Sequence, residues 1–323
     1  MIREDIKIGV YGLHQYYLHG YMWLPDDGMV NRVIHILHGM TEHIGRYEQF
    51  AKDLTQFGIA VVGFDLRGHG RNSGPADCAS FLSGQKSDSD YGWERSVDEI
   101  KQQIDYVKKR IPHADYYLMG FSLGSFMLRD YIRTHRLKKI NGVIVVGSGY
   151  QPPIVTKIMQ LVALNQIHKA NVAGTTDLIR QLSFGTYNKP FAGAENATGM
   201  EWLCSDEQSL AEYQSDSLVR KDIAADLFYE LLGAMSRTNK KRAFFLKKLD
   251  LSNVPVLIIS GAEDPVGNNG QDVEKISKIF KSYNAQSITP IIVPEARHDV
   301  FHEYKNGRYN EMMHALIEWL GIS

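Results

Sequence analysis

Short, almost wholly apolar stretches alternate along the chain with longer amphipathic ones. The apolar stretches have the length and composition of strands that are buried on both faces of a parallel sheet. They span residues 32–37, 59–64, 116–119, 142–147, 256–260 and 288–293. The intervening stretches have apolar residues at helical spacing and span residues 46–57, 93–110, 123–135, 271–283 and 309–320. Because strand and helix alternate, the pattern predicts an α/β protein with a mostly parallel, doubly wound sheet.

Two parts of the chain depart from this alternation. Residues 6–23 are rich in Tyr, Ile, Val and Leu broken by glycines, which indicates two antiparallel strands at a sheet edge. Residues 151–246 contain helical segments and Gly-, Asn- and Thr-rich joints but no convincing buried strand. We therefore expect a core formed by residues 1–150 and 247–323, with a helical cap, or lid, inserted at residues 151–246.

One helix of the predicted cap, at residues 154–164, is strongly apolar. Its apolar residues cover more than one helical stripe, and Lys157 is its only charge. A helix of this kind either packs on the core or presents an apolar face to something else. The sequence pattern leaves both interpretations open.

The strand at 116–119 runs into Gly120-Phe121-Ser122-Leu123-Gly124, directly before a helix. A serine at such a sharp turn takes a strained backbone conformation, which is tolerated when the glycines on either side lack a Cβ. The strain lifts the hydroxyl clear of the sheet, and the helix N-terminus provides positive potential for an oxyanion. Three fixed positions match by chance in roughly one chain in ten of this length, so the context must support the motif. With that context, Ser122 is the candidate nucleophile.

A serine nucleophile needs a base within hydrogen-bond reach, and the base needs a group that fixes its tautomer. Both are expected in loops at the edge where the carboxyl ends of the strands meet. Among twelve histidines, only His298 lies just after the last strand. Of the two carboxylates after strand 256–260, Asp264 is better placed because a proline holds its turn, and Glu263 is the reserve. The order Ser122, Asp264, His298 is typical of this architecture.

An oxyanion formed on a carbonyl substrate needs backbone N–H donors. One donor is expected from Leu123, the residue after the serine. The other is expected from the loop after strand 32–37, most simply from Met40. His38 and Gly39 would then be structural and let that loop turn in close.

Two other motifs suggest different chemistry. Residues 298–302 carry histidines at i and i+4, as a zinc-binding helix does, but they follow a strand and lack a third ligand. Residues 65–74 are rich in glycine, but no Gly-Lys-Ser/Thr follows and no helix begins there. A tight turn is therefore favoured over a phosphate cradle. We expect neither a metal nor a cofactor.

Charge and cysteine content narrow the partners and the compartment. The 323 residues have a formal net charge of −1 and only short Lys/Arg blocks, so nucleic acid is not expected as a partner. Cys78 and Cys204 do not make the disulfide framework of a secreted domain. The N-terminus mixes both charge signs without an apolar run, and no window approaches a membrane span. We predict a cytoplasmic protein, and its oligomeric state is open.

Several stretches, taken in order, resemble the α/β-hydrolase superfamily. More narrowly, they resemble its monoacylglycerol lipase and lysophospholipase branch, which is also grouped with the serine aminopeptidases. The stretches are residues 38–47, 64–70, 120–124, 261–266 and 297–299. A segment of the predicted cap, Glu201 to Glu207, more weakly resembles a segment of bacterial members. The chain departs from the family at Ile44-Gly45, where a small polar residue and Gly are expected.

This resemblance implies an α/β-hydrolase fold and cleavage of carboxylic esters through an acyl-enzyme on Ser122, without a cofactor. It also implies that the helix at 154–164 is an apolar lid that lines an acyl channel or touches a membrane surface. The expected substrate is then a monoacyl lipid, either a monoacylglycerol or a lysophospholipid, or a medium-chain ester.

Two alternatives remain. A serine aminopeptidase or amidase would use the same three residues, and an aminopeptidase would also need an acidic cap residue for the substrate ammonium. The candidate carboxylates are Glu195, Glu201, Asp206, Glu207 and Glu212. A non-catalytic binding protein on this fold typically lacks one of the three catalytic residues, whereas this chain has all of them.

Overall fold

An eight-stranded sheet forms the centre of the computed structural model, which describes residues 1–10, 16–73, 78–81, 92–169, 174–191, 198–240 and 249–322. The strand order is β1-β2-β4-β3-β6-β7-β9-β10. These strands are β1 (Ile2–Val10), β2 (Tyr16–Leu24), β3 (Arg32–Leu37), β4 (Ile59–Phe64), β6 (Asp115–Phe121), β7 (Gly142–Val146), β9 (Val256–Gly261) and β10 (Ile288–Val293). Strand β2 is antiparallel to β1 and β4, and the pairs from β4 to β10 are parallel. The predicted parallel sheet and antiparallel edge are confirmed.

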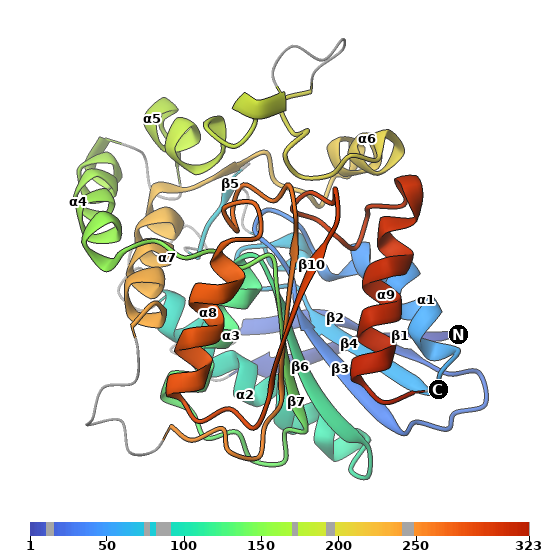
Figure 1. Cartoon of the computed structure of the whole chain (residues 1–323). Helices are drawn as coiled ribbons and strands as arrows, with labels where there is room; N and C mark the ends of the chain where they lie inside the picture. Colours follow the sequence, from blue (N-terminus) through green and yellow to red (C-terminus); the bar gives the residue numbers. More distant parts are fainter. Residues whose placement is uncertain are drawn as a thin grey trace.

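Helices cover both faces of this sheet (Figure 1). They are α1 (Glu48–Thr55), α2 (Gly92–Arg110), α3 (Leu123–Thr134), α8 (Asp272–Ser282) and α9 (Arg308–Trp319). Successive residues of a strand point to opposite faces, so Val143 joins a core with α2, α3 and α8, while Ile144 joins a core with α1 and α9. The two cores explain why the central strands are apolar throughout. The predicted α/β class with a doubly wound sheet is confirmed.

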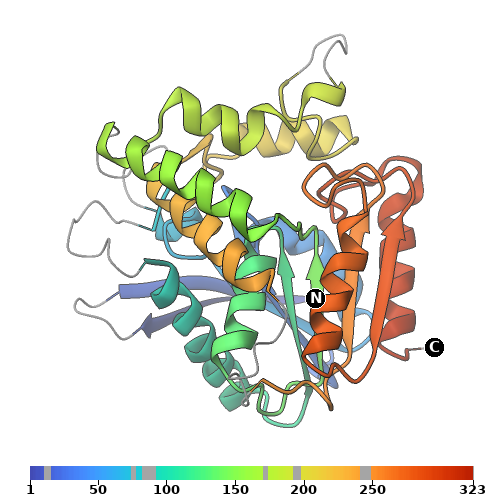
Figure 2. The ribbon, with the colours of Figure 1, turned by 60° about the vertical axis from the view of Figure 1, so that its left-hand side comes forward.

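Between β7 and β9 the chain leaves the sheet and passes over one end of it (Figures 1 and 2). We call residues 151–169, 174–191 and 198–240 the cap segment. Its elements are α4 (Pro153–Lys169), α5 (Asp177–Arg180), a π-helical turn (Gln181–Gly185), a 3-10 turn (Lys189–Phe191), α6 (Glu207–Ser215), β8 (Asp222–Ile223) and α7 (Ala225–Thr238). Helix α4 packs along α7, and α7 contacts the core helix α3. No helix in the described ranges is long and apolar enough to cross a bilayer.

The structure differs from the sequence pattern at two points. Strand β8 lies where no strand is predicted, and it pairs in parallel with β5 (Cys78–Ala79). A two-residue ladder is too short to show any alternation in the sequence. The helix predicted from residue 46 begins instead as a 3-10 turn at Ile44–Tyr47 and continues as α1. The division into core and cap stays a prediction, and its second boundary, at residue 246, lies outside the described residues.

Arg129 of α3 ties both ends of the cap segment to the core. Its guanidinium donates to Ser148 Oγ (3.1 Å) and Gly149 O (3.2 Å), just before the cap segment. It also donates to Thr238 O (3.1 Å) and Asn239 Oδ1 (2.7 Å), at the end of α7. These four acceptors are neutral, and burial lowers the pKa of Arg129 to about 10. Because a buried cation needs its acceptors, the two ends of the cap segment are held together beside α3.

Candidate active site

Ser122 lies at the turn between β6 and α3, where its backbone takes φ 48° and ψ −115°. Positive φ at a residue other than glycine costs on the order of 1–3 kcal/mol, so the surroundings must hold it. A Cβ on Gly120 would lie 2.4 Å from Gly124 O, and a Cβ on Gly124 would lie 2.0 Å from Leu37 O. The two glycines therefore let α3 approach β6 and the end of β3 closely.

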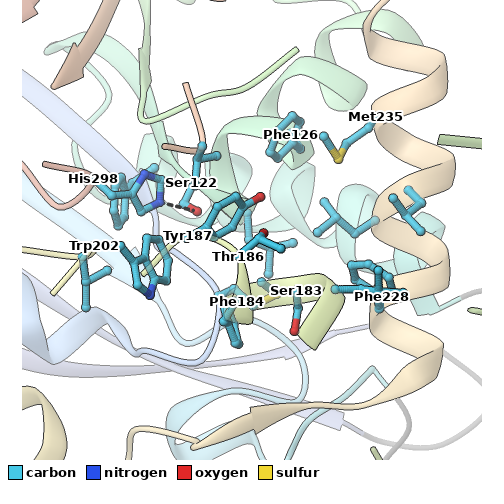
Figure 3. Close-up of a pocket in the computed structure, with 18 of the residues that line it drawn as sticks. Ser122, Phe126, Ser183, Phe184, Thr186, Tyr187, Trp202, Phe228, Met235 and His298 are labelled. Atoms are coloured by element: carbon cyan, nitrogen blue, oxygen red, sulfur yellow. Dashed lines mark hydrogen bonds between the residues drawn. The ribbon is translucent and has the colours of Figure 1, made fainter. Parts of the chain in front are cut away.

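His298 lies in the loop after β10 and Asp264 in the loop after β9, and Figure 3 shows His298 beside Ser122. His298 Nε2 lies 2.9 Å from Ser122 Oγ, and His298 Nδ1 lies 2.8 Å from Asp264 Oδ1. The exposed fractions of His298 and Asp264 are 1% and 0%. The reserve acid, Glu263, is half exposed, and its Oε2 lies 3.8 Å from Arg297 Nε. The structure thus brings together Ser122, Asp264 and His298 and leaves Glu263 outside this chain of contacts.

Two buried side chains hold the loop that follows β3. Leu66 N–H donates to His38 Nε2 (2.8 Å), so His38 carries its proton on Nδ1 and donates to Gly39 O (2.7 Å). Burial lowers the pKa of His38 to about 4, which keeps this neutral tautomer at neutral pH. On the other side, Glu42 Oε1 accepts the N–H of Gly39 (2.6 Å). Both polar groups of Gly39 are therefore fixed.

This arrangement orients the next N–H group, that of Met40. The C=O and N–H groups of a trans peptide point in opposite directions, so the bond to Gly39 O turns the Met40 N–H away from His38. Met40 and Leu123 both line the cavity that contains Ser122. Within the described ranges, neither the Met40 N–H nor the Leu123 N–H has an acceptor. Two donors are thus available where the sequence predicts them.

A buried ion-pair network lies behind the loop. Arg46 Nε lies 3.1 Å from Glu42 Oε2, and Arg46 Nη2 lies 3.2 Å from Asp299 Oδ2. Asp299 Oδ2 also lies 2.8 Å from His302 Nδ1. Burial would raise the pKa of Asp299, but His302 and Arg46 outweigh it and lower this pKa to about 2. No sequence motif predicts this network, although Glu42, Arg46 and Asp299 belong to the stretches that resemble the family.

Residues 201–205 of the cap segment lie against the loop that carries His298, and we call them the strap. Trp202 O accepts the N–H of His298 (3.4 Å). Leu203 O accepts the N–H of Asp299 (2.7 Å). The segment from Glu201 to Glu207 therefore has a defined place, because it accepts hydrogen bonds from the main-chain N–H groups of the candidate base and of the residue after it.

The strap also contributes an aromatic ring to the site. The ring centroids of Trp202 and His298 are 5.3 Å apart, with an angle of 35° between the rings. Phe121 of β6 lies 4.9 Å from the same imidazole. Phe184 and Tyr187 of the cap segment pack on Trp202 in turn, at 5.8 and 5.2 Å. His298 thus contacts aromatic rings from both the core and the cap segment.

Ser122 opens into a cavity of about 220 Å³ between the core and the cap segment. One arm of this cavity, the apolar arm, is formed by α3, α4 and α7 through Phe126, Met159, Phe228, Leu231, Leu232 and Met235. The other, the mixed arm, is lined by Met40, Glu42, Met200, Trp202, Leu203 and Tyr213. Figure 3 shows Phe126 and Met235 on one side of Ser122 and Trp202 on the other. The serine therefore lies between two regions of different polarity.

Two of the candidate carboxylates for a substrate ammonium form hydrogen bonds within the cap segment. Glu201 accepts hydrogen bonds from Asn188 Nδ2 (2.7 Å) and Thr198 Oγ1 (2.8 Å). Burial would raise the pKa of Glu201, but these and further hydrogen bonds lower it to about 2. Asp206 Oδ1 accepts the N–H of Ser209 (2.9 Å) and so caps α6.

The described Glu207 and Glu212, two of the other candidate carboxylates, do not line the cavity either. The Glu207 side chain is 93% exposed, Glu212 is on the exposed face of α6, and Glu195 lies outside the described residues. Among the described cavity-lining residues, the carboxylate is that of Glu42. Its oxygens already bind the loop, Arg46 and the hydroxyl of Tyr47 (2.8 Å). The described site therefore offers no free carboxylate to a substrate ammonium.

The structure describes residues 298–302 completely and the glycine-rich turn as far as residue 73. Residues 298–302 form no helix, and the described ranges contain no group of three His, Cys, Asp or Glu side chains arranged to hold a metal. The glycine-rich turn, described up to residue 73, folds around buried Asp65. The Asp65 carboxylate accepts the N–H groups of Ile44 (3.0 Å) and Arg71 (3.0 Å).

Comparison with known proteins identifies the family. The Hydrolase_4 family model, described as serine aminopeptidase, S33, matches residues 28–305. The chain belongs to this family. As a family member, it is 24% identical to human monoglyceride lipase over 297 residues, which cover 89% of this chain and 85% of that protein. It is also 24% identical to a monoglyceride lipase homolog of Monkeypox virus over 260 residues, 80% of each chain.

The fold of this family member has solved counterparts. A thermostable carboxyl esterase from Bacillus coagulans superposes with a TM-score of 0.80 at 19% identity, over 99% of this chain and 98% of that one. The predicted α/β-hydrolase fold and monoacylglycerol lipase-like branch are thereby confirmed. The protein is an enzyme with hydrolase activity, and the interpretation as a non-catalytic binding protein is set aside.

Proposed function

We propose that this enzyme hydrolyses carboxylic esters of monoacyl lipids, or medium-chain esters, through an acyl-enzyme on Ser122. The observation that carries the proposal is the contact chain from Ser122 through His298 to Asp264 beside an apolar cavity. The three side chains have the geometry of a nucleophile, a general base and the group that orients the base. The names of its monoglyceride lipase relatives agree with this substrate class.

In the proposed reaction, Ser122 Oγ attacks the ester carbonyl carbon while its proton passes to His298 Nε2. Asp264 holds the proton on His298 Nδ1 and stabilises the imidazolium. The N–H groups of Met40 and Leu123 bind the oxyanion. When the intermediate collapses, the ester C–O bond breaks and His298 gives its proton to the leaving alcohol. Water, deprotonated by His298, then attacks the acyl-enzyme and releases the carboxylic acid.

The cavity supports the assignment of a lipid substrate. An acyl chain gains about 25 cal/mol per Å² of apolar surface removed from water, so it favours the apolar arm. The alcohol portion, which is polar in monoacylglycerols and lysophospholipids, then lies in the mixed arm. The catalytic serine sits between the two arms, where the ester bond joins the acyl and alcohol parts.

The aminopeptidase alternative has less support from the site. The described lining has no free carboxylate for an ammonium group, as shown above for Glu201 and Glu42. We therefore expect p-nitrophenyl acyl esters to react far faster than amino-acid p-nitroanilides. Faster hydrolysis of the anilides by the purified enzyme would replace the lipase proposal with the aminopeptidase alternative.

The decisive experiment is a hydrolysis profile over p-nitrophenyl esters from acetate to palmitate, with monoacylglycerol and lysophospholipid alongside. We expect an optimum at medium or long acyl chains, because the apolar arm binds methylene groups. Ser122→Ala should lower kcat/KM by about 10³-fold or more. Activity confined to acetate and butyrate would remove the lipid part of the proposal, and full activity of Ser122→Ala would remove the mechanism.

We also propose that α4 touches a lipid surface. Ile154, Ile158 and Leu161 are 71%, 59% and 68% exposed, and they lie on one side of the helix with the exposed Lys157 beside them. An apolar helical face flanked by lysine is typical of helices that lie in a membrane interface.

Vesicle co-sedimentation tests this contact. The double variant Ile158→Glu/Leu161→Glu should bind anionic phospholipid vesicles much more weakly than the wild type. Phe57→Glu serves as the control. It replaces an apolar side chain that is 45% exposed and lies about a hundred residues before α4 in the sequence. Equal vesicle binding by both variants and the wild type would contradict the contact.

A further inference from the structure

A second hollow, of about 360 Å³, adjoins the mixed arm of the catalytic cavity. Met200 and Tyr213 line both spaces, so the two hollows share a wall. Besides Val219, the remaining lining of the second hollow is made of polar residues: Thr198, Gln214, Asp216, Arg220 and Lys221. This hollow has no role in the reaction described above.

The hollow is fixed to the oxyanion loop by hydrogen bonds. Arg220 N–H donates to Thr41 O (2.8 Å), and Thr41 Oγ1 lies 2.6 Å from the hydroxyl of Tyr213. Thr41 directly follows Met40, whose N–H is an expected oxyanion donor. The backbone of Arg220 is therefore hydrogen-bonded to the residue after the expected oxyanion donor, Met40, on the side of the mixed arm.

The charges in this hollow are not balanced. The Arg220 guanidinium donates to the neutral hydroxyl of Ser73. Over the ranges that the structure describes, no carboxylate forms an ion pair with Arg220, and none does so with the exposed Lys221. The carboxylate in the hollow, Asp216, already accepts hydrogen bonds on both oxygens, from His43 Nε2 (2.7 Å) and Leu218 N–H (2.8 Å). Among the described residues, these two cations are therefore available to an anionic ligand.

The position of the hollow indicates which part of a substrate would reach it. With the acyl chain in the apolar arm, the glycerol portion enters the mixed arm, and a substituent on the glycerol extends toward Met200 and Tyr213. A phosphate has the charge and the acceptor oxygens that arginine and lysine bind well.

Resting on the proposed function, we propose that Arg220 and Lys221 form a head-group subsite for phosphate. The preferred substrates are then anionic monoacyl phospholipids rather than neutral monoacylglycerols. The subsite adds selectivity for the leaving group and takes no part in the chemical step. A free phosphate ion shares this chemistry, so the experiment must separate the two sources of the group.

The experiment compares kcat/KM for two soluble substrates with the same acyl chain, monooctanoylglycerol and monooctanoyl glycerophosphate. For the wild type we expect a higher value with the phosphate substrate. Arg220→Gln and Lys221→Gln should each lower the phosphate-to-neutral ratio, to a combined loss of roughly tenfold, as for partly exposed charge contacts. The preference should also weaken as salt is added, because exposed charges are screened.

Lys281→Gln is the matched control, because it removes an exposed lysine at the end of α8. It should leave the ratio at the wild-type value. A ratio that is unchanged in both subsite variants would overturn the head-group proposal. A second result would also overturn it: inorganic phosphate inhibits the hydrolysis of monooctanoylglycerol at constant ionic strength, and the enzyme shows no preference for the phosphate substrate. The hollow would then bind the free ion and not the head group.

Failure of this proposal is separable from failure of the proposed function. If the wild type hydrolyses both substrates and Ser122→Ala hydrolyses neither, the esterase function stands whatever the ratio shows. If the wild type hydrolyses neither substrate nor any p-nitrophenyl ester, the proposed function fails, and the head-group proposal falls with it.

Discussion

The sheet core and the cap segment differ in how far their apolar side chains are exposed to solvent. In β4, β7 and β9 every residue is buried. The cap segment contributes six of the twelve large apolar side chains that are exposed in the described ranges: Ile154, Val155, Ile158, Leu161, Leu164 and Leu178. A strand that is apolar on both faces is stable only between two layers of helices. A helix that is apolar on all sides can line a cavity with one side and still expose apolar side chains on another.

This contrast separates two tasks. In the proposed mechanism the core holds the reacting side chains, since Ser122, Asp264 and His298 all lie in segments that follow strand ends. The cap segment supplies most of the apolar arm, where the acyl chain of the proposed substrate would bind. The strap crosses the division, because it belongs to the cap segment by sequence but bonds to the loop of the candidate base, His298. Substitutions can test how far the two tasks are separate.

The largest effect is expected in the core. Asp264→Asn should lower kcat by about 10⁴-fold, because the amide no longer holds His298 in the required tautomer. Glu263→Gln, its neighbour, should retain most of the activity, because Glu263 faces Arg297 and solvent. Steady-state kinetics with a p-nitrophenyl ester measures both. Similar losses in the two variants would show that the orienting acid is misassigned.

A smaller but clear effect is expected from the strap. Trp202→Ala should lower kcat by about 10- to 100-fold with a lesser change in KM, because the ring that supports His298 and its imidazolium is lost. Trp202→Phe should recover much of this loss.

Trp319→Phe, which alters a tryptophan packed on Tyr117 of the core, is the control for a general loss of stability. If Trp202→Ala changed KM alone, the strap would act only on substrate binding. The core would then hold all the residues that affect the chemical step, and the whole cap segment, the strap included, would act on substrate binding.

The smallest effect concerns stability where α7 meets α2. Glu230 accepts the N–H of Trp93, and burial raises the pKa of Glu230 from 4.5 to about 7. A raised folded-state pKa means that stability is fully present below pH 4.5 and is lost as pH rises through about 7. Glu230→Gln cannot ionise, so it should be more stable than the wild type by ~1–3 kcal/mol at pH 8 and similar at pH 4.5.

Thermal unfolding at the two pH values measures this difference. An equal shift of the melting temperature at pH 4.5 and pH 8 would show that the side chain acts through packing rather than through its charge. The result would also show whether the contact between the cap segment and the core responds to pH.

The sequence predicts the core better than the cap segment for a physical reason. Parallel strands end at one edge of a sheet, so a serine, an aspartate and a histidine after three different strands are expected together. In the side-chain network, Glu42 and Arg46 are close in sequence, but Asp299 comes from a distant part of the chain, and no local pattern indicates that it joins them. Apolar periodicity also cannot show which side of α4 faces the cavity, because that helix has apolar residues on several sides.

The carboxylates of the cap segment show the same limit. Glu201 looks available in the sequence, but in the structure its oxygens accept hydrogen bonds from Asn188 and Thr198. A count of acidic residues cannot separate such a structural carboxylate from one that faces a ligand. The contact between Trp202 and His298 is equally hidden, because almost a hundred residues separate the two in the chain.

The hydrogen bonds of the strap have a consequence for how this enzyme diversifies. If the cap segment only enclosed the substrate, the cap segment of one relative could replace that of another, and each replacement would change the substrate specificity. Here residues 201–205 share main-chain hydrogen bonds with the loop of His298, so a transplanted cap must also recreate that junction. Recombination would succeed when the strap is inherited with the core and only the helices around it are replaced.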